Sequence, residues 1–275
     1  MTDSALDGWP TPLNGWPVRY KRRVSARHSP PPELDAKSSA KTRRYQLGAL
    51  LVTIAGVAVV LISILASGST SDLRPGKPVP GAAKALKIFA GISQHGIELG
   101  NPHAPVTLVE LGDLQCPACS QFSAEALPQI VSRYVRTGKV LLVFRALDLI
   151  GKDSLLAARM ALAAGEQNRL FEFDALMYAN QGLENSGYVT DTYLRALAGA
   201  IPGLDVARAL AARDSAAVRA QLGEAKQLGL RLHIAGTPSF LLYRTDTTPR
   251  RFKPSGLDAS SFTGPVQQLL TEAGA

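Results

Sequence analysis

The stretch VTLVELGDLQCPAC, residues 106–119, decides the fold of this 275-residue chain. Its first six residues are mostly β-branched or apolar, which is typical of a largely buried strand. Past the second cysteine, Phe122, Ala126, Ile130 and Tyr134 recur at helical spacing. This spacing predicts a helix that begins at the cysteines. The sequence therefore predicts a strand, a short loop and a helix, with both cysteines where the helix starts.

Cys116 and Cys119 are the only cysteines in the chain and are separated by Pro117 and Ala118. A disulfide between them closes a very small loop and restrains little of the unfolded chain, so it contributes little to stability. The pair is therefore expected to serve a chemical reaction rather than the stability of the fold. Pro117 suits the first helical turn, where its missing N–H leaves no bond unmade. The free N–H groups of that turn favour the thiolate of Cys116, which predicts that Cys116 is the nucleophile. Cys119, one turn further along, would resolve a mixed disulfide.

The same two cysteines could form half of a zinc site. Zinc needs two further ligands, and the histidines of the chain are His28, His95, His103 and His233. No two of them have the H-x₃₋₅-H spacing of a zinc site. The sequence therefore favours a redox pair, and we expect no metal and no cofactor.

Two further segments carry a resemblance to a known family. Residues 101–105 (Asn-Pro-His-Ala-Pro) precede the predicted strand, and Gly236-Thr237-Pro238-Ser239-Phe240 precedes a second apolar run. With the C-x-x-C pair, these segments resemble the membrane-tethered DsbA-like family of bacteria, which has a thioredoxin-like fold. The resemblance implies that Pro238 is cis and packs beside the cysteines. It also implies that Thr237 offers backbone hydrogen bonds to an extended substrate, with Pro117 and Ala118 on the same substrate-binding surface.

Glu110 lies six residues before Cys116. Family members carry a buried acid at this position that accepts and returns the proton of the second cysteine. From the residues alone, a Glu in an apolar strand lies on the solvent face or is buried for a reason. Alternation places Glu110 on the same face as Leu108 and Gly112, which is consistent with an inward position. We include Glu110 with Cys116 and Cys119 as a candidate catalytic residue.

The remaining pattern is mostly helical. Residues 139–147 predict a strand, residues 153–180 are rich in Ala and Leu at helical spacing, and further helices are expected near 190–200, 204–212, 214–229 and 258–272. The resemblance implies that a helical subdomain, about 151–230, is inserted into the thioredoxin half. The expected fold class is α/β, thioredoxin-like with this insertion, preceded by one transmembrane helix.

Residues 47–66 are twenty uncharged, mostly apolar residues. As a helix they span about 30 Å, the thickness of the hydrocarbon core of a bilayer. Nine Lys and Arg residues precede this segment, which predicts a cytoplasmic N-terminus and an extracytoplasmic C-terminal part. The alternative is a signal peptide cleaved near Ala66-Ser67-Gly68. The expected organisation is a disordered basic cytoplasmic tail (1–46), a transmembrane helix (47–66), a linker (67–84) and the catalytic domain (85–275).

The net charge of +8 does not indicate a nucleic-acid-binding protein. Residues 1–46 hold nine Lys and Arg against four Asp and Glu, so most of the excess lies beside the apolar segment. A nucleic-acid-binding domain concentrates its basic residues on the folded part.

The leading hypothesis is a single-pass cell-membrane oxidase that introduces disulfides into thiol-containing exported proteins. A membrane quinone-linked partner of the DsbB or VKOR kind would reoxidise it. The alternatives are a disulfide reductase or isomerase and a tethered binding protein or holdase without turnover. Strongly oxidising relatives have His where this chain has Ala118, so the direction of electron flow stays open.

Overall fold

The computed structural model describes residues 73–275. The expected tail (1–46), the expected transmembrane helix (47–66) and the first part of the expected linker lie outside the described residues. Within 73–275, no helix combines the length and apolarity that a membrane span requires.

A six-stranded sheet forms the centre of the domain, in the order β1-β2-β4-β3-β5-β6. Its strands are β1 (Gln94–His95), β2 (Glu98–Leu99), β3 (Val106–Gly112), β4 (Val140–Ala146), β5 (Ser239–Arg244) and β6 (Arg251–Phe252). β3 pairs in parallel with β4 and antiparallel with β5. All seven residues of β3 are buried. A strand covered on both faces has a nearly continuous apolar sequence, which explains the composition of the predicted strand.

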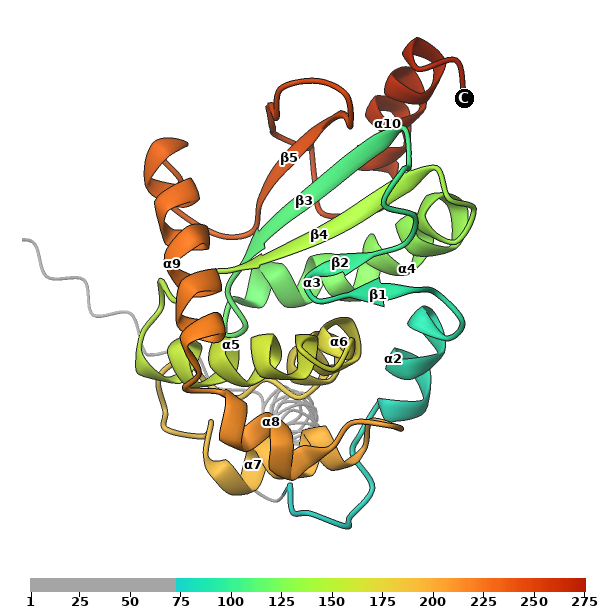
Figure 1. Cartoon of the computed structure of the whole chain (residues 1–275). Helices are drawn as coiled ribbons and strands as arrows, with labels where there is room; N and C mark the ends of the chain where they lie inside the picture. The colour runs from blue at the N-terminus through green and yellow to red at the C-terminus, as the bar shows by residue number, and fades with distance from the viewer. Residues whose placement is uncertain (1–72) are drawn as a thin grey trace, which may run out of the picture. The chain divides into compact units, whose positions relative to one another are not determined.

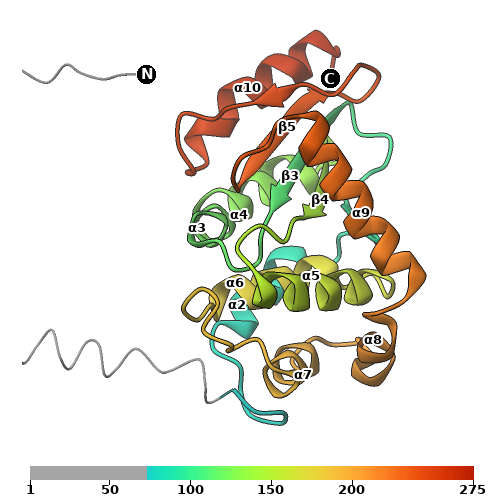
Figure 2. The same cartoon turned by 90° about the vertical axis from the view of Figure 1, so that its left-hand side faces the viewer.

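Helices lie on both faces of the sheet (Figure 1, Figure 2). One face carries α3 (Pro117–Glu125), α4 (Leu127–Ile130), the π-helical turn η2 (Val131–Val135) and α10 (Ser260–Glu272). The core on this face includes Leu108, Cys119 and Phe122. The other face carries α9 (Ala216–Arg231), and its smaller core includes Val109, Leu111 and Ala225. Even-numbered residues of β3 therefore face the cysteines, and odd-numbered residues face α9.

The helical insertion runs from β4 to β5. Its helices are α5 (Lys152–Gly165), α6 (Leu170–Ala179), α7 (Asp191–Gly199), α8 (Val206–Ala212) and α9. The side chains of Thr190, Asp205 and Ser215 cap the N-termini of the last three, since each accepts a backbone N–H of the first turn. The Ala/Leu-rich stretch predicted over 153–180 is two helices, because the chain turns before Leu170 with Asn168 at a left-handed φ of 57°.

The start of the domain differs from the expected linker boundary at residue 84. Helix α2 (Ala82–Phe89) begins within the expected linker and buries Ala85 and Phe89. The ring of Phe89 packs against that of Phe171 in α6, with centroids 6.0 Å apart. Short polar and Gly/Pro-rich residues come just before α2, so composition placed the boundary a few residues too late. The two-residue strands β1 and β2 were not predicted, because alternation has no meaning over two residues.

Candidate active site

Cys116 occupies the N-cap position of α3, and its side chain makes no capping hydrogen bond. Its backbone is extended, with φ −72° and ψ 121°, and Pro117 opens the helix. The loop Asp113–Gln115 brings the chain from the end of β3 to this point, and the N–H of Cys116 donates to the carbonyl of Asp113 at 3.0 Å. Both cysteines are free thiols in the structure. Cys116 is 7% exposed and Cys119 is fully buried, so an attacking thiol can reach only the first.

The surroundings of Cys116 favour its thiolate. The pKa of Cys116 is lowered to about 6, mainly by a hydrogen bond from the Cys119 thiol. Burial opposes this shift, and the Thr237 side chain and the backbone N–H groups of Cys119 and Ala118 add to it. These N–H groups belong to the first turn of α3, where they have no partner within the helix. The arrangement provides a thiolate at neutral pH.

Cys119 has the opposite environment. Its pKa is raised well above the ordinary value, first by burial and then by its hydrogen bond to Cys116 and the charge of Glu110. The two thiols therefore differ in both exposure and acidity, which allows one to act as nucleophile and the other to stay protonated.

Glu110 is buried on the cysteine side of β3, the face that it shares with Leu108 and Gly112. Burial, followed by the charge of Cys116, raises the pKa of Glu110 to about 8. Its Oε1 atom has no hydrogen-bond partner within the described residues. Gly112 leaves room for the carboxyl, because a Cβ there would lie 3.1 Å from Oε1 and 2.7 Å from the Phe144 ring. Glu110 therefore holds a proton near neutral pH, within electrostatic reach of Cys116 and Cys119.

Pro238 lies beside the cysteines at the start of β5. The Thr237–Pro238 peptide bond is cis, and the thiol of Cys116 donates to the carbonyl of Thr237 at 3.2 Å. A groove of about 650 Å³ continues from Pro238 along Phe240, Phe252 and Leu257. The structure thus brings Thr237, Pro238, Pro117 and Ala118 around one thiol, and an open groove leads away from Pro238.

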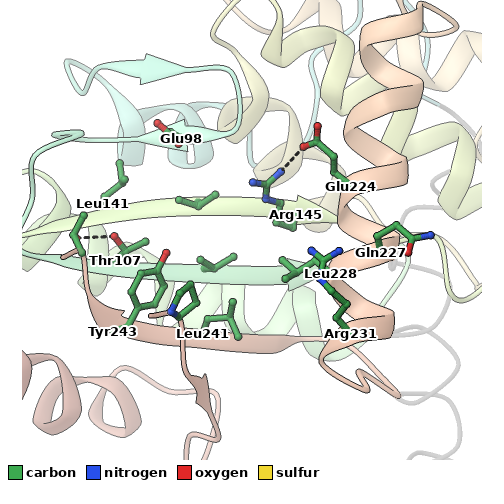
Figure 3. Close-up of a pocket in the computed structure, with 14 residues that line it drawn as sticks. Glu98, Thr107, Leu141, Arg145, Glu224, Gln227, Leu228, Arg231, Leu241 and Tyr243 are labelled. Carbon is green, nitrogen blue, oxygen red and sulfur yellow. Dashed lines mark hydrogen bonds and ion pairs between the residues drawn. The ribbon is translucent and has the colours of Figure 1, made fainter. Parts of the chain in front are cut away.

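The groove drawn in Figure 3 lies on the other face of the sheet. It has a volume of about 710 Å³ and a floor that includes Leu141, Leu241 and Tyr243. At its rim Arg145 points toward Glu224 at 3.4 Å. None of the lining residues is a cysteine or a histidine. Since its β3 residues are odd-numbered, this groove is separated from the thiols by the sheet.

Sequence reasoning missed two buried polar side chains beneath the cysteines. Tyr178 of α6 donates to the carbonyl of Asp113 at 3.4 Å. Asp174, one turn earlier on α6, is buried with both carboxyl oxygens unpartnered among the described residues. Burial, then the charges of Glu110 and Glu172, raises the pKa of Asp174 well above its usual range. The sequence did hold one indication of Asp174, since an acidic residue within the apolar sequence of α6 is unusual unless it has a role.

Residues 93–252 match the family model described as "Thioredoxin". The probable disulfide bond formation protein D of Bacillus cereus is 31% identical over 159 residues, which are 57% of this chain and 73% of that protein. Disulfide bond formation protein D of Bacillus subtilis is 26% identical over 156 residues, 56% of this chain and 69% of that protein.

Two solved structures share the fold. Oxidised BdbD from Bacillus subtilis superposes with a TM-score of 0.57 at 22% identity, covering 66% of this chain and 98% of that one. Wolbachia pipientis α-DsbA1 superposes with a TM-score of 0.55 at 21% identity, covering 69% of this chain and 97% of that one. At these identities the likeness concerns the fold alone.

Proposed function

Since the chain belongs to the thioredoxin family and is a DsbA-like thiol:disulfide oxidoreductase, we propose that it introduces disulfide bonds into exported proteins through Cys116 and Cys119. The observation that carries the proposal is the asymmetry of the two thiols. Cys116 is reachable and has a pKa of about 6, whereas Cys119 is fully buried and has a raised pKa.

The reaction starts from the Cys116–Cys119 disulfide. A substrate thiolate attacks the sulfur of Cys116, a mixed disulfide forms, and Cys119 leaves as a thiolate. Glu110, with a pKa of about 8, supplies a proton to this buried thiolate. A second substrate thiolate then attacks the substrate sulfur of the mixed disulfide, and Cys116 leaves as a stabilised thiolate. Two electrons pass from the substrate to the enzyme, and the substrate leaves with a disulfide.

A low nucleophile pKa favours this direction of electron flow. Stabilising the Cys116 thiolate stabilises the reduced enzyme, which makes its disulfide a stronger oxidant. The extended groove beside cis-Pro238 supports an unfolded peptide as substrate, held against the backbone of Thr237.

The first prediction is a reduction potential above roughly −200 mV, in the range of oxidases and isomerases. The potential is measured by equilibrating the full-length chain in glutathione or dithiothreitol buffers and alkylating the remaining thiols. The purified disulfide form should also oxidise a reduced dithiol peptide in stoichiometric amounts. A potential near about −270 mV would make the chain a reductase instead, and binding of peptide without exchange would make it a holdase.

Regeneration of the disulfide requires an electron acceptor. We assign this role to a membrane quinone-linked protein of the DsbB or VKOR kind. The apolar segment 47–66 and its basic N-terminal flank support a single-pass anchor in the cell membrane, with residues 67–275 outside the cytoplasm. An extracytoplasmic position suits an oxidase, because cytoplasmic thiol pools would keep the pair reduced.

The second prediction concerns this topology. An impermeant protease added to intact cells should digest the domain and leave a membrane-bound N-terminal fragment of about seven kilodaltons, as expected from some 70 residues. Permeabilised cells provide the control, in which the N-terminal tail should also be lost. Protection of the domain in intact cells would overturn the orientation.

A further inference from the structure

Side-chain amides from the helical insertion hold the loop that carries the nucleophile. Gln181 lies two residues beyond the end of α6. Its Nε2 donates to the carbonyl of Leu114 at 2.9 Å and to the carbonyl of Cys116 at 3.2 Å. One side chain of the insertion thus fixes two carbonyls, one of them the carbonyl of the nucleophile itself.

Gln115, directly before Cys116, is held from the same region. It is 1% exposed, and its Nε2 donates to Ser154 of α5 at 3.0 Å. Its Oε1 accepts the backbone N–H of Asn185 at 2.8 Å, and the amides of the two side chains approach to 3.4 Å. A buried amide with its oxygen and nitrogen both bonded has a fixed orientation.

The network closes through the loop after β4. The Nδ2 of Asn185 donates to the carbonyl of Ile150 at 2.6 Å. The buried carboxyl of Asp113 accepts the N–H of Ile150 at 3.0 Å and that of Gln115 at 2.9 Å. Gly151 makes the space, because a Cβ there would lie within 2.3–2.8 Å of the Asn185 side chain. We call Gln115, Gln181 and Asn185 the amide clamp.

The clamp acts on the peptide groups on both sides of the sulfur. The N–H groups of Ala118 and Cys119 stabilise the Cys116 thiolate only while the first turn of α3 keeps its orientation. If a carbonyl of this loop rotated toward the sulfur, the partial negative charge of its oxygen would repel the negative charge of the thiolate and destabilise it. Gln181 holds the carbonyls of Leu114 and Cys116 against such a rotation, together with the N–H of Ser120, which also donates to the Cys116 carbonyl at 3.1 Å. Gln115, the residue before Cys116, is anchored to Ser154 and Asn185.

We propose that Gln181 and Asn185 are positioning residues through which the helical insertion sets the redox equilibrium of Cys116 and Cys119. The proposal rests on Cys116 being the nucleophile, but it does not depend on the direction of electron flow. It gives the insertion a role in the chemistry itself, although its helices contribute neither cysteine.

The test compares Gln181→Leu and Asn185→Gly with Gln167→Leu in the full-length chain. Gln167 is a matched control, since its amide also bonds backbone atoms within the insertion, at Asp205, and lies far along the chain from the cysteines. Asn185 has a left-handed φ of 51°, so glycine removes the side chain and keeps the backbone conformation. Each variant is equilibrated in glutathione buffers, and thiolate formation is followed by ultraviolet absorbance against pH.

Gln181→Leu should shift the thiol–disulfide equilibrium about tenfold toward the disulfide, which is ~30 mV for a two-electron couple. The thiolate of Cys116 should then appear at higher pH. Asn185→Gly should act in the same direction but less, because its backbone N–H still binds Gln115. Gln167→Leu should change neither value. The proposal is overturned if both clamp variants have the reduction potential of the wild type and only their melting temperatures are lowered, as in Gln167→Leu. The clamp would then contribute to stability and not to the redox equilibrium. The proposed function is judged separately, from the potential of the wild type alone.

Discussion

Replacement of Cys116 by serine is expected to reduce disulfide exchange by on the order of 10³-fold or more, since removing a nucleophile removes the covalent route altogether. Replacement of Cys119 should stop turnover in a different way. Without Cys119 the chain has no disulfide for a substrate thiolate to attack, so oxidation stops. The Cys116 thiolate can still attack an added disulfide peptide and release one peptide thiolate, and the mixed disulfide that forms has no resolving thiol and should accumulate. The rate of oxidation of a reduced dithiol peptide, and the intact mass of each variant after incubation with a disulfide peptide, distinguish the two variants.

The expected asymmetry follows from where the two sulfurs lie. Cys116 is at the open end of α3 with a pKa of about 6, and Cys119 is fully buried with a raised pKa. Alkylation of the reduced chain should therefore proceed well below pH 8 at Cys116 and be lost in Cys116→Ser. Ser120→Ala serves as control, because Ser120 lies in the same turn and its hydroxyl donates to the backbone carbonyl of Tyr178 in α6. Equal alkylation rates at both cysteines would contradict the assignment.

Much of the fold could be predicted from the sequence. Residues 106–119 specify a strand, a loop and a helix because the strand is apolar and proline is tolerated at the first helical position. The thioredoxin-like fold and the helical insertion, predicted from the resemblance, are confirmed. The helices after residue 190 lie near their predicted bounds, because Gly187-Tyr188, Pro202-Gly203 and Asp214 interrupt the helical pattern in the sequence. The structure adds the caps Thr190, Asp205 and Ser215, which the prediction did not use.

The parts of the site that could not be predicted depend on contacts between distant residues. Nothing local indicates that Gln181 binds the carbonyl of Cys116, 65 residues away. The depth of Glu110 was also undecided, because alternation loses its meaning in a strand that is buried on both faces. Asp174 and Tyr178 lie near the cysteines only because α6 packs against α3, and this tertiary contact could not be predicted from the local sequence.

Replacement of Glu110 by glutamine is expected to change the free energy of unfolding of the reduced domain in a pH-dependent way. The difference between variant and wild type should be more favourable to the variant at alkaline pH than at pH 4, by up to roughly 5 kcal/mol. This figure follows from about 1.36 kcal/mol per unit of pKa shift. The pKa of Glu110 rises from 4.5 to about 8 on folding. Between these values the folded protein binds a proton that the unfolded chain has lost, so stability falls as the pH rises. Glutamine carries no such proton, and this slope should vanish in the variant.

The difference between wild type and Glu110→Gln isolates this carboxyl. Cys116, whose pKa is lowered to about 6, contributes a slope of the opposite sign above that pH in both proteins. Urea unfolding of the reduced chain from pH 4 to pH 9 gives the two curves, with Glu98→Gln as a control at a half-buried acid of β2. Because glutamine cannot supply a proton to the Cys119 thiolate, exchange at pH 7 should also slow by roughly 10²-fold. Parallel stability curves with an unchanged rate would show that Glu110 is neither protonated in the folded domain nor a proton donor to Cys119.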